Sequence, residues 1–188
     1  MAQPNIKQII KQEYIKCAKD PVYFMKKYCW IQHPTRGRVQ FNLYPFQEGA
    51  LNLLQKNDRN IILKSRQLGI STLSAGISLW MMVFQKDKAI LVVATKQDTA
   101  KNLVTKVKFM YDNLPSWLQI GFVENNKLAL RLKNGSQVKA VSAASDAGRS
   151  EAISLLIIDE AAFIEENRIE EIWGSSQQTL STGGRAIV

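Results

Sequence analysis

The order of a few short segments constrains the fold of this 188-residue chain more than any other feature. An apolar run at Asn60–Leu63 is suited to a buried strand, a loop follows it, and Ser71–Phe84 is typical of a helix. Much later, the apolar run Leu155–Ile158 ends directly in two adjacent carboxylates. Strands separated by helices predict an α/β fold with a mainly parallel sheet flanked by helices.

The loop after the first apolar run is an incomplete match to the phosphate-binding pattern G-x-x-x-x-G-K-[ST]. Gly69 fixes the register, so that Lys64 stands at the first glycine position, Ile70 at the lysine position and Ser71 at the hydroxyl position. The N-terminus of the following helix still offers free N–H groups and a positive dipole end to a polyphosphate. Lys64 or Arg66 can supply the missing charge from the entry side of the loop. The alternative is an ordinary strand-to-helix turn with two solvated basic residues.

The two carboxylates are Asp159 and Glu160. Carboxylates at the end of a buried strand carry a desolvation cost, so their presence suggests a functional role. The carboxyl end of a parallel strand opens onto the crevice where ligands bind. We expect Asp159 to hold Mg²⁺ through water and Glu160 to activate the attacking water, which suits phosphoryl transfer from ATP. The alternative is a helix N-cap followed by a first-turn acid.

Three motifs occur together in the chain: Tyr44-Pro-Phe-Gln47, Ser65-Arg-Gln-Leu-Gly69 and Ile157-Ile-Asp-Glu-Ala-Ala-Phe163. Together they resemble the large terminase subunit of tailed double-stranded DNA phages. The resemblance implies a P-loop NTPase-type ATPase domain with a deviant phosphate loop, whose lysine stands at the start of the loop in some members. It also implies a motor that packages viral DNA into preformed capsids, with a C-terminal RNase H-like nuclease domain.

The resemblance further implies roles for single residues. Gln47 is expected to contact adenine, although a surface glutamine on an amphipathic helix is the alternative. Arg66 is expected to act on the γ-phosphate, and Arg149 either reaches a neighbouring subunit's site as an arginine finger or is a solvated loop arginine. The implied catalytic residues are Glu160, Arg66 and Arg149, the Mg²⁺ ligands are Ser71 and Asp159, and the ATP-binding residues are Gln47, Lys64, Ser65, Arg66, Gln67, Leu68, Gly69, Ile70, Ser71 and Thr72.

Two parts of the chain are expected. Residues 1–38 form an N-terminal helical appendage with helices at Ile6–Ala18 and from Pro21, and the loop Gln32–Arg38 marks the boundary. Residues 39–188 form the ATPase core, truncated before the coupling motif and the nuclease domain. We therefore expect the isolated chain to bind nucleotide weakly and to hydrolyse it slowly.

The remaining patterns complete the expected core. Ala89–Ala94 is a second buried strand, and Asn134-Gly135 between two alternating segments predicts a β-hairpin insertion. A basic helix follows the second strand. The lysines of this region either contact DNA or lie on a solvated face of the helix. They are Lys96, just before the helix, and Lys101, Lys106 and Lys108 on it.

Charge and composition bear on the partners. The net charge of +9 suits a protein that meets a polyanion, here double-stranded DNA. The resemblance adds a portal protein, a small terminase subunit and a homo-oligomeric ring. No apolar stretch reaches membrane-spanning length, so we expect no membrane association and a place in the host cytoplasm. Cys17, Cys29 and His33 are too widely spaced to predict a metal site.

Two other functions remain open at this stage. A superfamily-2-like helicase or translocase shares the glutamine, the phosphate loop and the paired carboxylates, but normally keeps the lysine after Gly69. A non-enzymatic DNA-binding protein with a decayed nucleotide site is suggested by Ile70 itself.

Overall fold

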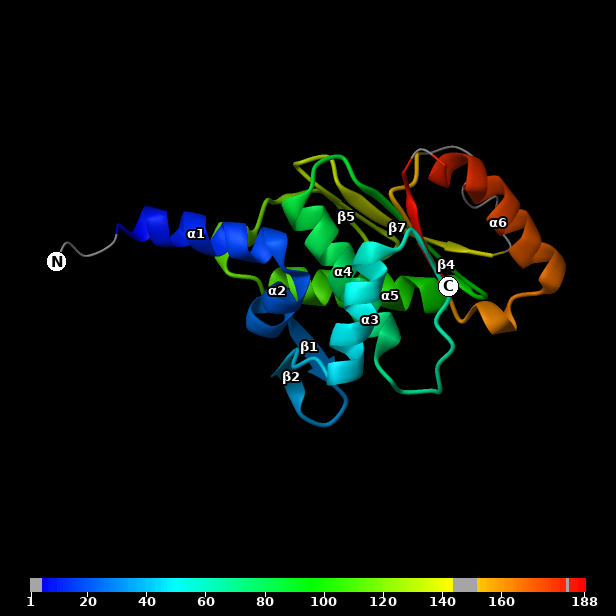
Figure 1. The fold of residues 1–188 in the computed structure, drawn as a ribbon, viewed down its shortest axis with the longest axis horizontal. Helices are drawn as coiled ribbons and strands as arrows, with labels where there is room; N and C mark the ends of the chain where they lie inside the picture. The colour runs from blue at the N-terminus through cyan, green and yellow to red at the C-terminus, as the bar shows by residue number, and fades with distance from the viewer. Residues whose placement is uncertain (1–4, 144–151, 182) are drawn as a thin grey trace.

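The structure, a computed structural model, describes residues 5–143, 152–181 and 183–188. A sheet lies at its centre, with helices packed against it (Figure 1). The helices are α1 (Ile6–Lys19), α2 (Pro21–Tyr28), α3 (Pro45–Lys56), α4 (Ile70–Phe84), α5 (Gln97–Asp112) and α6 (Glu166–Leu180), with 3₁₀ turns η1 (Ser116–Leu118) and η2 (Ala161–Phe163). The strands are β1 (Trp30–His33), β2 (Gly37–Gln40), β3 (Arg59–Asn60), β4 (Ala89–Ala94), β5 (Phe122–Asn125), β6 (Ala129–Leu132), β7 (Gln137–Ser142), β8 (Leu155–Asp159) and β9 (Arg185–Ile187).

The central sheet has seven strands in the order β3-β9-β8-β4-β7-β6-β5. The first five strands in this order, β3, β9, β8, β4 and β7, run parallel to one another. Strand β6 is antiparallel to both β7 and β5. The predicted mainly parallel sheet is therefore confirmed. The predicted hairpin is confirmed as well, since β6 and β7 pair on either side of Asn134 and Gly135.

Strands β4 and β8 are apolar at nearly every position because both of their faces are buried. Alternate residues such as Ile90 and Leu155 face a large core that includes α4 and α5. The residues between them, such as Leu91 and Leu156, face a smaller core under α6. The strands thus lie between two helical layers.

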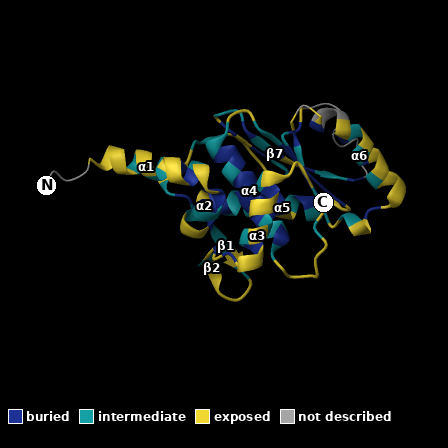
Figure 2. Ribbon diagram, in the orientation of Figure 1, coloured by how far each residue is buried: buried dark blue, intermediate teal, exposed yellow. Residues whose placement is uncertain are grey.

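The first two helices are close to their predicted positions and begin at side-chain caps. Asn5 accepts from the Lys7 N–H, and Asp20 accepts from the Tyr23 N–H with Pro21 in the first turn. Helix α1 projects from the body and is mostly exposed (Figures 1 and 2). At its C-terminal end the Trp80 indole donates to the Cys17 carbonyl at 2.9 Å. These helices therefore share one core with α4, while the division at residue 38 stays a prediction.

Two local predictions are wrong. The segment expected to be a loop at Gln32–Arg38 is mostly an antiparallel hairpin, in which His33 pairs with Gly37. The run Asn60–Leu63 is not a buried strand: β3 ends at Asn60, and Leu63 is fully exposed. The reason is that β3 lies at the sheet edge, where its only described neighbour is the short strand β9.

Candidate nucleotide site

The loop between β3 and α4 ends at Gly69, and the first turn of α4 presents N–H groups that have no acceptor within the helix. Gly69 caps α4 with a left-handed backbone, φ 71°, which glycine adopts at little cost. Its carbonyl accepts the first intrahelical bond, from the Leu73 N–H at 2.9 Å. The N–H groups of the preceding helical residues have no acceptor within the helix, so this end of α4 is suited to an anion.

Gln47, on the first turn of α3, holds this loop from behind. Its side-chain amide donates to the Leu68 carbonyl at 2.9 Å, and its side-chain oxygen accepts from the Tyr44 N–H at 3.0 Å. The side chain is only 3% exposed. The alternative of a surface glutamine is therefore excluded, while a contact with adenine stays a prediction.

Ile70 occupies the position where the strict pattern has its lysine. Its side chain belongs to the large core and is 8% exposed. Only its backbone N–H is left for a phosphate. This position therefore supplies no cation.

A hydrogen bond joins the first turn of α4, which follows the loop, to the end of β8. The Ser71 hydroxyl donates to Asp159 Oδ1 at 3.0 Å, although the two residues are 88 positions apart. Asp159 is the last residue of β8 and pairs with Ala94 at the carboxyl end of β4. The structure thus brings the two predicted Mg²⁺ ligands together at the carboxyl edge of the sheet.

Glu160 leaves the sheet directly after Asp159. Its backbone is left-handed, φ 57° and ψ 41°, and its carbonyl accepts from the Phe163 N–H at 2.9 Å in the turn η2. Non-glycine residues rarely adopt this conformation, and such strain is most common at functional sites. The Glu160 side chain is exposed.

The other predicted residues divide into three groups. The entry side of the loop is exposed at Lys64–Leu68, and Thr72 is half-buried in the first turn of α4. Gln67, with φ 63°, gives the loop a second left-handed turn. Arg149 lies outside the described residues.

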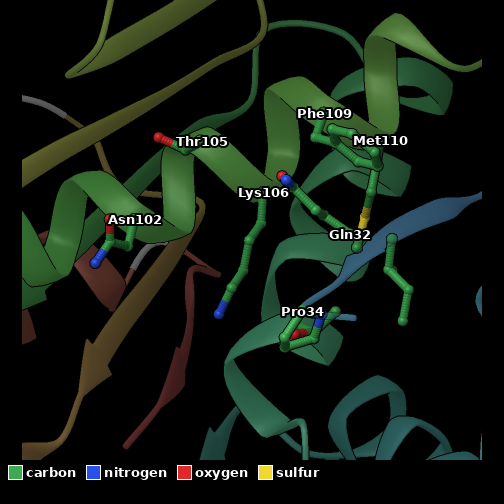
Figure 3. A pocket seen from close by; sticks show the side chains of 9 residues that line it. Gln32, Pro34, Asn102, Thr105, Lys106, Phe109 and Met110 are labelled. Atoms are coloured by element: carbon green, nitrogen blue, oxygen red, sulfur yellow. The ribbon is translucent and has the colours of Figure 1, made fainter. Parts of the chain in front are cut away.

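A cavity of about 440 Å³ lies between α5 and the β1–β2 hairpin and reaches Thr72 in the first turn of α4. Figure 3 shows the Lys106 side chain extending from α5, with its ammonium group at the tip. Burial lowers the pKa of Lys106, and the charge of Lys64 lowers it further, whereas the charge of Asp159 opposes the shift. The cavity is lined by Ile31, Gln32, Pro34, Thr72, Asn102, Thr105, Lys106, Phe109 and Met110.

Two features of this region were not predicted as parts of the site. Lys106 was expected on a DNA-contacting or solvated face, and helical spacing alone could not indicate that it lies within electrostatic range of Asp159. Tyr44 and Phe46 stack with their ring centroids 5.7 Å apart, and both are substantially exposed beside Gln47. The motif around Gln47 contained both aromatic residues, but only the structure shows that they form a pair.

A parallel sheet, a loop leading into a helix N-terminus, and a carboxylate at the end of a nearby strand define a P-loop NTPase-type domain. The chain belongs to the family described as the terminase large subunit, T4likevirus-type, N-terminal, which matches residues 61–184. The family predicted from the three sequence motifs is thereby confirmed.

Solved structures with a similar fold are large terminases. The HK97 bacteriophage large terminase has a TM-score of 0.71 and 20% identity, over 90% of this chain and 36% of that one. The Thermus phage P74-26 large terminase ATPase domain has a TM-score of 0.63 and 20% identity, over 78% of this chain and 64% of that one. The large terminase of another thermophilic bacteriophage has a TM-score of 0.53 and 12% identity, over 71% and 34%. The chain thus spans about a third of the HK97 protein.

No helix among the described residues combines the length and apolar character needed to span a membrane.

Proposed function

We propose that this chain is the ATP-hydrolysing motor domain of a viral DNA-packaging terminase, in which hydrolysis is coupled to movement of double-stranded DNA into a capsid. The observation that carries the proposal is the 3.0 Å hydrogen bond between Ser71 and Asp159, which joins the phosphate loop to the carboxylate strand. Family membership favours a packaging motor over the helicase alternative.

ATP binds with its phosphates over the N–H groups from Gly69 to Thr72. Lys64 and Arg66, on the exposed entry side of the loop, neutralise the phosphates, and Arg66 acts on the γ-phosphate. The adenine lies near Gln47, whose amide retains one N–H and one lone pair after its two backbone hydrogen bonds. Backbone groups of Ser65, Gln67, Leu68 and Ile70 complete the loop.

The donor set fits Mg²⁺. A hydroxyl oxygen and a carboxylate oxygen lie 3.0 Å apart at Ser71 and Asp159, and hard oxygen ligands of this kind suit this ion, which usually retains several waters. When bound, Mg²⁺ neutralises charge on the β- and γ-phosphates. Ser71 and Asp159 would hold the ion at the carboxyl edge of the sheet.

Glu160 accepts a proton from the attacking water. Two observations support this role: Glu160 directly follows Asp159 at the end of β8, and its exposed side chain lies on a turn that leaves the sheet. In an assembled homo-oligomeric ring, Arg149 of a neighbouring subunit stabilises charge on the transferred phosphoryl group. Double-stranded DNA, a portal protein and a small terminase subunit are the proposed partners, in the host cytoplasm.

Replacing Glu160 tests this function. Glu160→Gln removes the base but keeps the size and hydrogen-bonding shape of the side chain, so hydrolysis should fall by roughly 10²-fold or more while ATP binding persists. Single-turnover hydrolysis and titration with a fluorescent ATP analogue measure the two quantities separately. The exposed Glu166 on α6 gives the matched control, Glu166→Gln. Near-normal hydrolysis by Glu160→Gln would refute the assignment of the base.

The wild-type chain alone should hydrolyse ATP slowly, because we propose that Arg149 of a neighbouring subunit completes the site. Vigorous steady-state turnover would contradict this part of the proposal. A non-enzymatic role remains the second candidate, because Ile70 is buried where a lysine is expected. ATP binding that is lost in Lys64→Met would argue against a decayed site.

A further inference from the structure

Lys106 stands apart from the other lysines of its region. On α5, Lys101 lies 3.7 Å from Asp98, and Lys108 lies 3.0 Å from Asp112. Both pairs are local to the helix, as expected for a solvated face. Lys106 lies between them in sequence but lines the cavity that reaches Thr72 at the start of α4 (Figure 3).

The Lys106 ammonium has no partner in the part of the chain that the structure describes. Within residues 5–143, 152–181 and 183–188 it makes no hydrogen bond or ion pair, although the side chain is half-buried. A partly buried ammonium group without a partner lowers the stability of the fold. A bound anion would offset this loss. The position therefore indicates a ligand rather than a structural salt bridge.

The cavity connects this charge with the proposed nucleotide site. Thr72, in the first turn of α4, lines the cavity with Lys106, and the adjacent Ser71 is bonded to Asp159. Lys106 is also within electrostatic range of both Lys64 and Asp159. Lys106, the first turn of α4 and the Asp159 carboxylate thus belong to one region at the carboxyl edge of the sheet.

We propose that Lys106 contacts the phosphates of bound ATP from α5 and supplies the charge that Ile70 does not provide within the loop. The inference rests on the proposed nucleotide function and deepens it by naming a phosphate-contacting residue outside the loop. Since Asp159 marks the side of the β- and γ-phosphates, Lys106 interacts with the outer part of the polyphosphate. Helix α5, which packs beside α4 on the same face of the sheet, would thereby contact the bound nucleotide.

The test compares Lys106→Met, Lys106→Arg and the wild-type chain. Methionine keeps most of the aliphatic stem and removes the charge, whereas arginine keeps the charge. Affinity is measured by titration with a fluorescent ATP analogue in the presence of Mg²⁺, and by competition with ATP and with inorganic tripolyphosphate, all at fixed ionic strength. Lys86→Met, in the exposed turn between α4 and β4, controls for the loss of one positive charge.

We expect Lys106→Met to weaken both ATP and tripolyphosphate binding by about tenfold or more, as for loss of a hydrogen bond to a charged group. Lys106→Arg should restore at least part of the affinity, and Lys86→Met should match the wild type. The melting temperature without ligand should not fall in Lys106→Met, because the ammonium it removes is unpaired. A loss of affinity that accompanies a lower melting temperature, and that arginine does not restore, would assign Lys106 a structural role and overturn the proposal.

The two proposals can fail separately. If Lys106→Met binds ATP as tightly as the wild-type chain does, the proposed role of Lys106 is overturned. The proposed nucleotide function is then unaffected. If the wild-type chain binds neither ATP nor tripolyphosphate, both proposals are overturned.

Discussion

The side-chain amide of Gln47 donates to the carbonyl of Leu68 at 2.9 Å, so the start of α3 is bonded directly to the phosphate loop. The contact is close enough to restrict the neighbouring position, because a Cβ at Gly69 would lie 2.8 Å from Gln47 Nε2. The loop conformation therefore depends on a glutamine 21 residues upstream as well as on its own glycine.

Gln47→Glu should destabilise the fold and weaken ATP binding. The carboxylate can still accept from the Tyr44 N–H, but it cannot donate to the Leu68 carbonyl when it is ionised. The buried carboxylate and the Leu68 carbonyl oxygen would both be acceptors at this contact, which should cost about 1–3 kcal/mol. Urea unfolding at neutral pH measures the loss, with Gln8→Glu on the exposed surface of α1 as the control. Equal stability of the two variants would show that the bond does not hold the loop.

Asp159→Asn should remove the Mg²⁺ dependence of ATP binding. The amide can still accept from the Ser71 hydroxyl, so the local packing is kept, but the negative charge that favours a divalent cation is lost. Titrations of a fluorescent ATP analogue with Mg²⁺ and with EDTA should therefore differ in the wild type and converge in the variant. Asp98→Asn, at an exposed side chain on α5, should behave like the wild type. A variant that retains the full Mg²⁺ effect would exclude Asp159 as a ligand.

Sequence patterns predicted the elements that are long and buried. The apolar runs at β4 and β8 could be recognised because both faces of these strands are covered, and α4 follows a loop whose glycine fixes the register. The short elements were harder to predict. In β1 and β2 only four residues each form the hairpin, and most of them are partly or fully exposed, so no apolar alternation marks them.

The candidate site could be predicted where the residues are adjacent in sequence, as in the loop or at the end of β8. Relationships between distant segments could not be predicted. The pattern around Gln47 does not show which backbone groups its amide meets, and the spacing of lysines on α5 does not show that Lys106 faces the cavity. Both depend on how helices are placed over the sheet, which local propensity does not determine.

Glu160 should be more tolerant of glycine than of alanine. Its left-handed backbone, φ 57°, costs an L-residue roughly 1–2 kcal/mol, and glycine removes this cost while adding unfolded-state entropy. Glu160→Gly should therefore be more stable than Glu160→Ala by about 0.5–1 kcal/mol, as measured by urea unfolding. Neither variant should hydrolyse ATP. If the alanine variant is as stable as the glycine variant, the turn has relaxed and the strain does not persist.

The free energy of unfolding should decrease at acid pH, in part because Glu13 becomes protonated. Lys27 donates to Glu13 Oε1 at 2.7 Å, and the Tyr23 and Tyr28 hydroxyls donate to the same oxygen at 2.5 and 2.8 Å. The bond from Lys27, followed by that from Tyr23, lowers the pKa of the Glu13 carboxyl from 4.5 to about 2.

The sign of the pH effect follows from this lowered pKa. The contribution of Glu13 is fully present above pH 4.5, the ordinary value, and is lost as the pH falls toward 2. Glu13→Gln should cost about 1–2 kcal/mol at neutral pH, and its deficit relative to the wild type should shrink between pH 4.5 and 2. Unfolding at a series of pH values measures the difference. Glu48→Gln, which breaks the exposed pair with Lys26, should lose at most about 1 kcal/mol. A deficit of Glu13→Gln that stays constant from pH 7 to pH 2 would show that its charge does not stabilise the junction of α1 and α2.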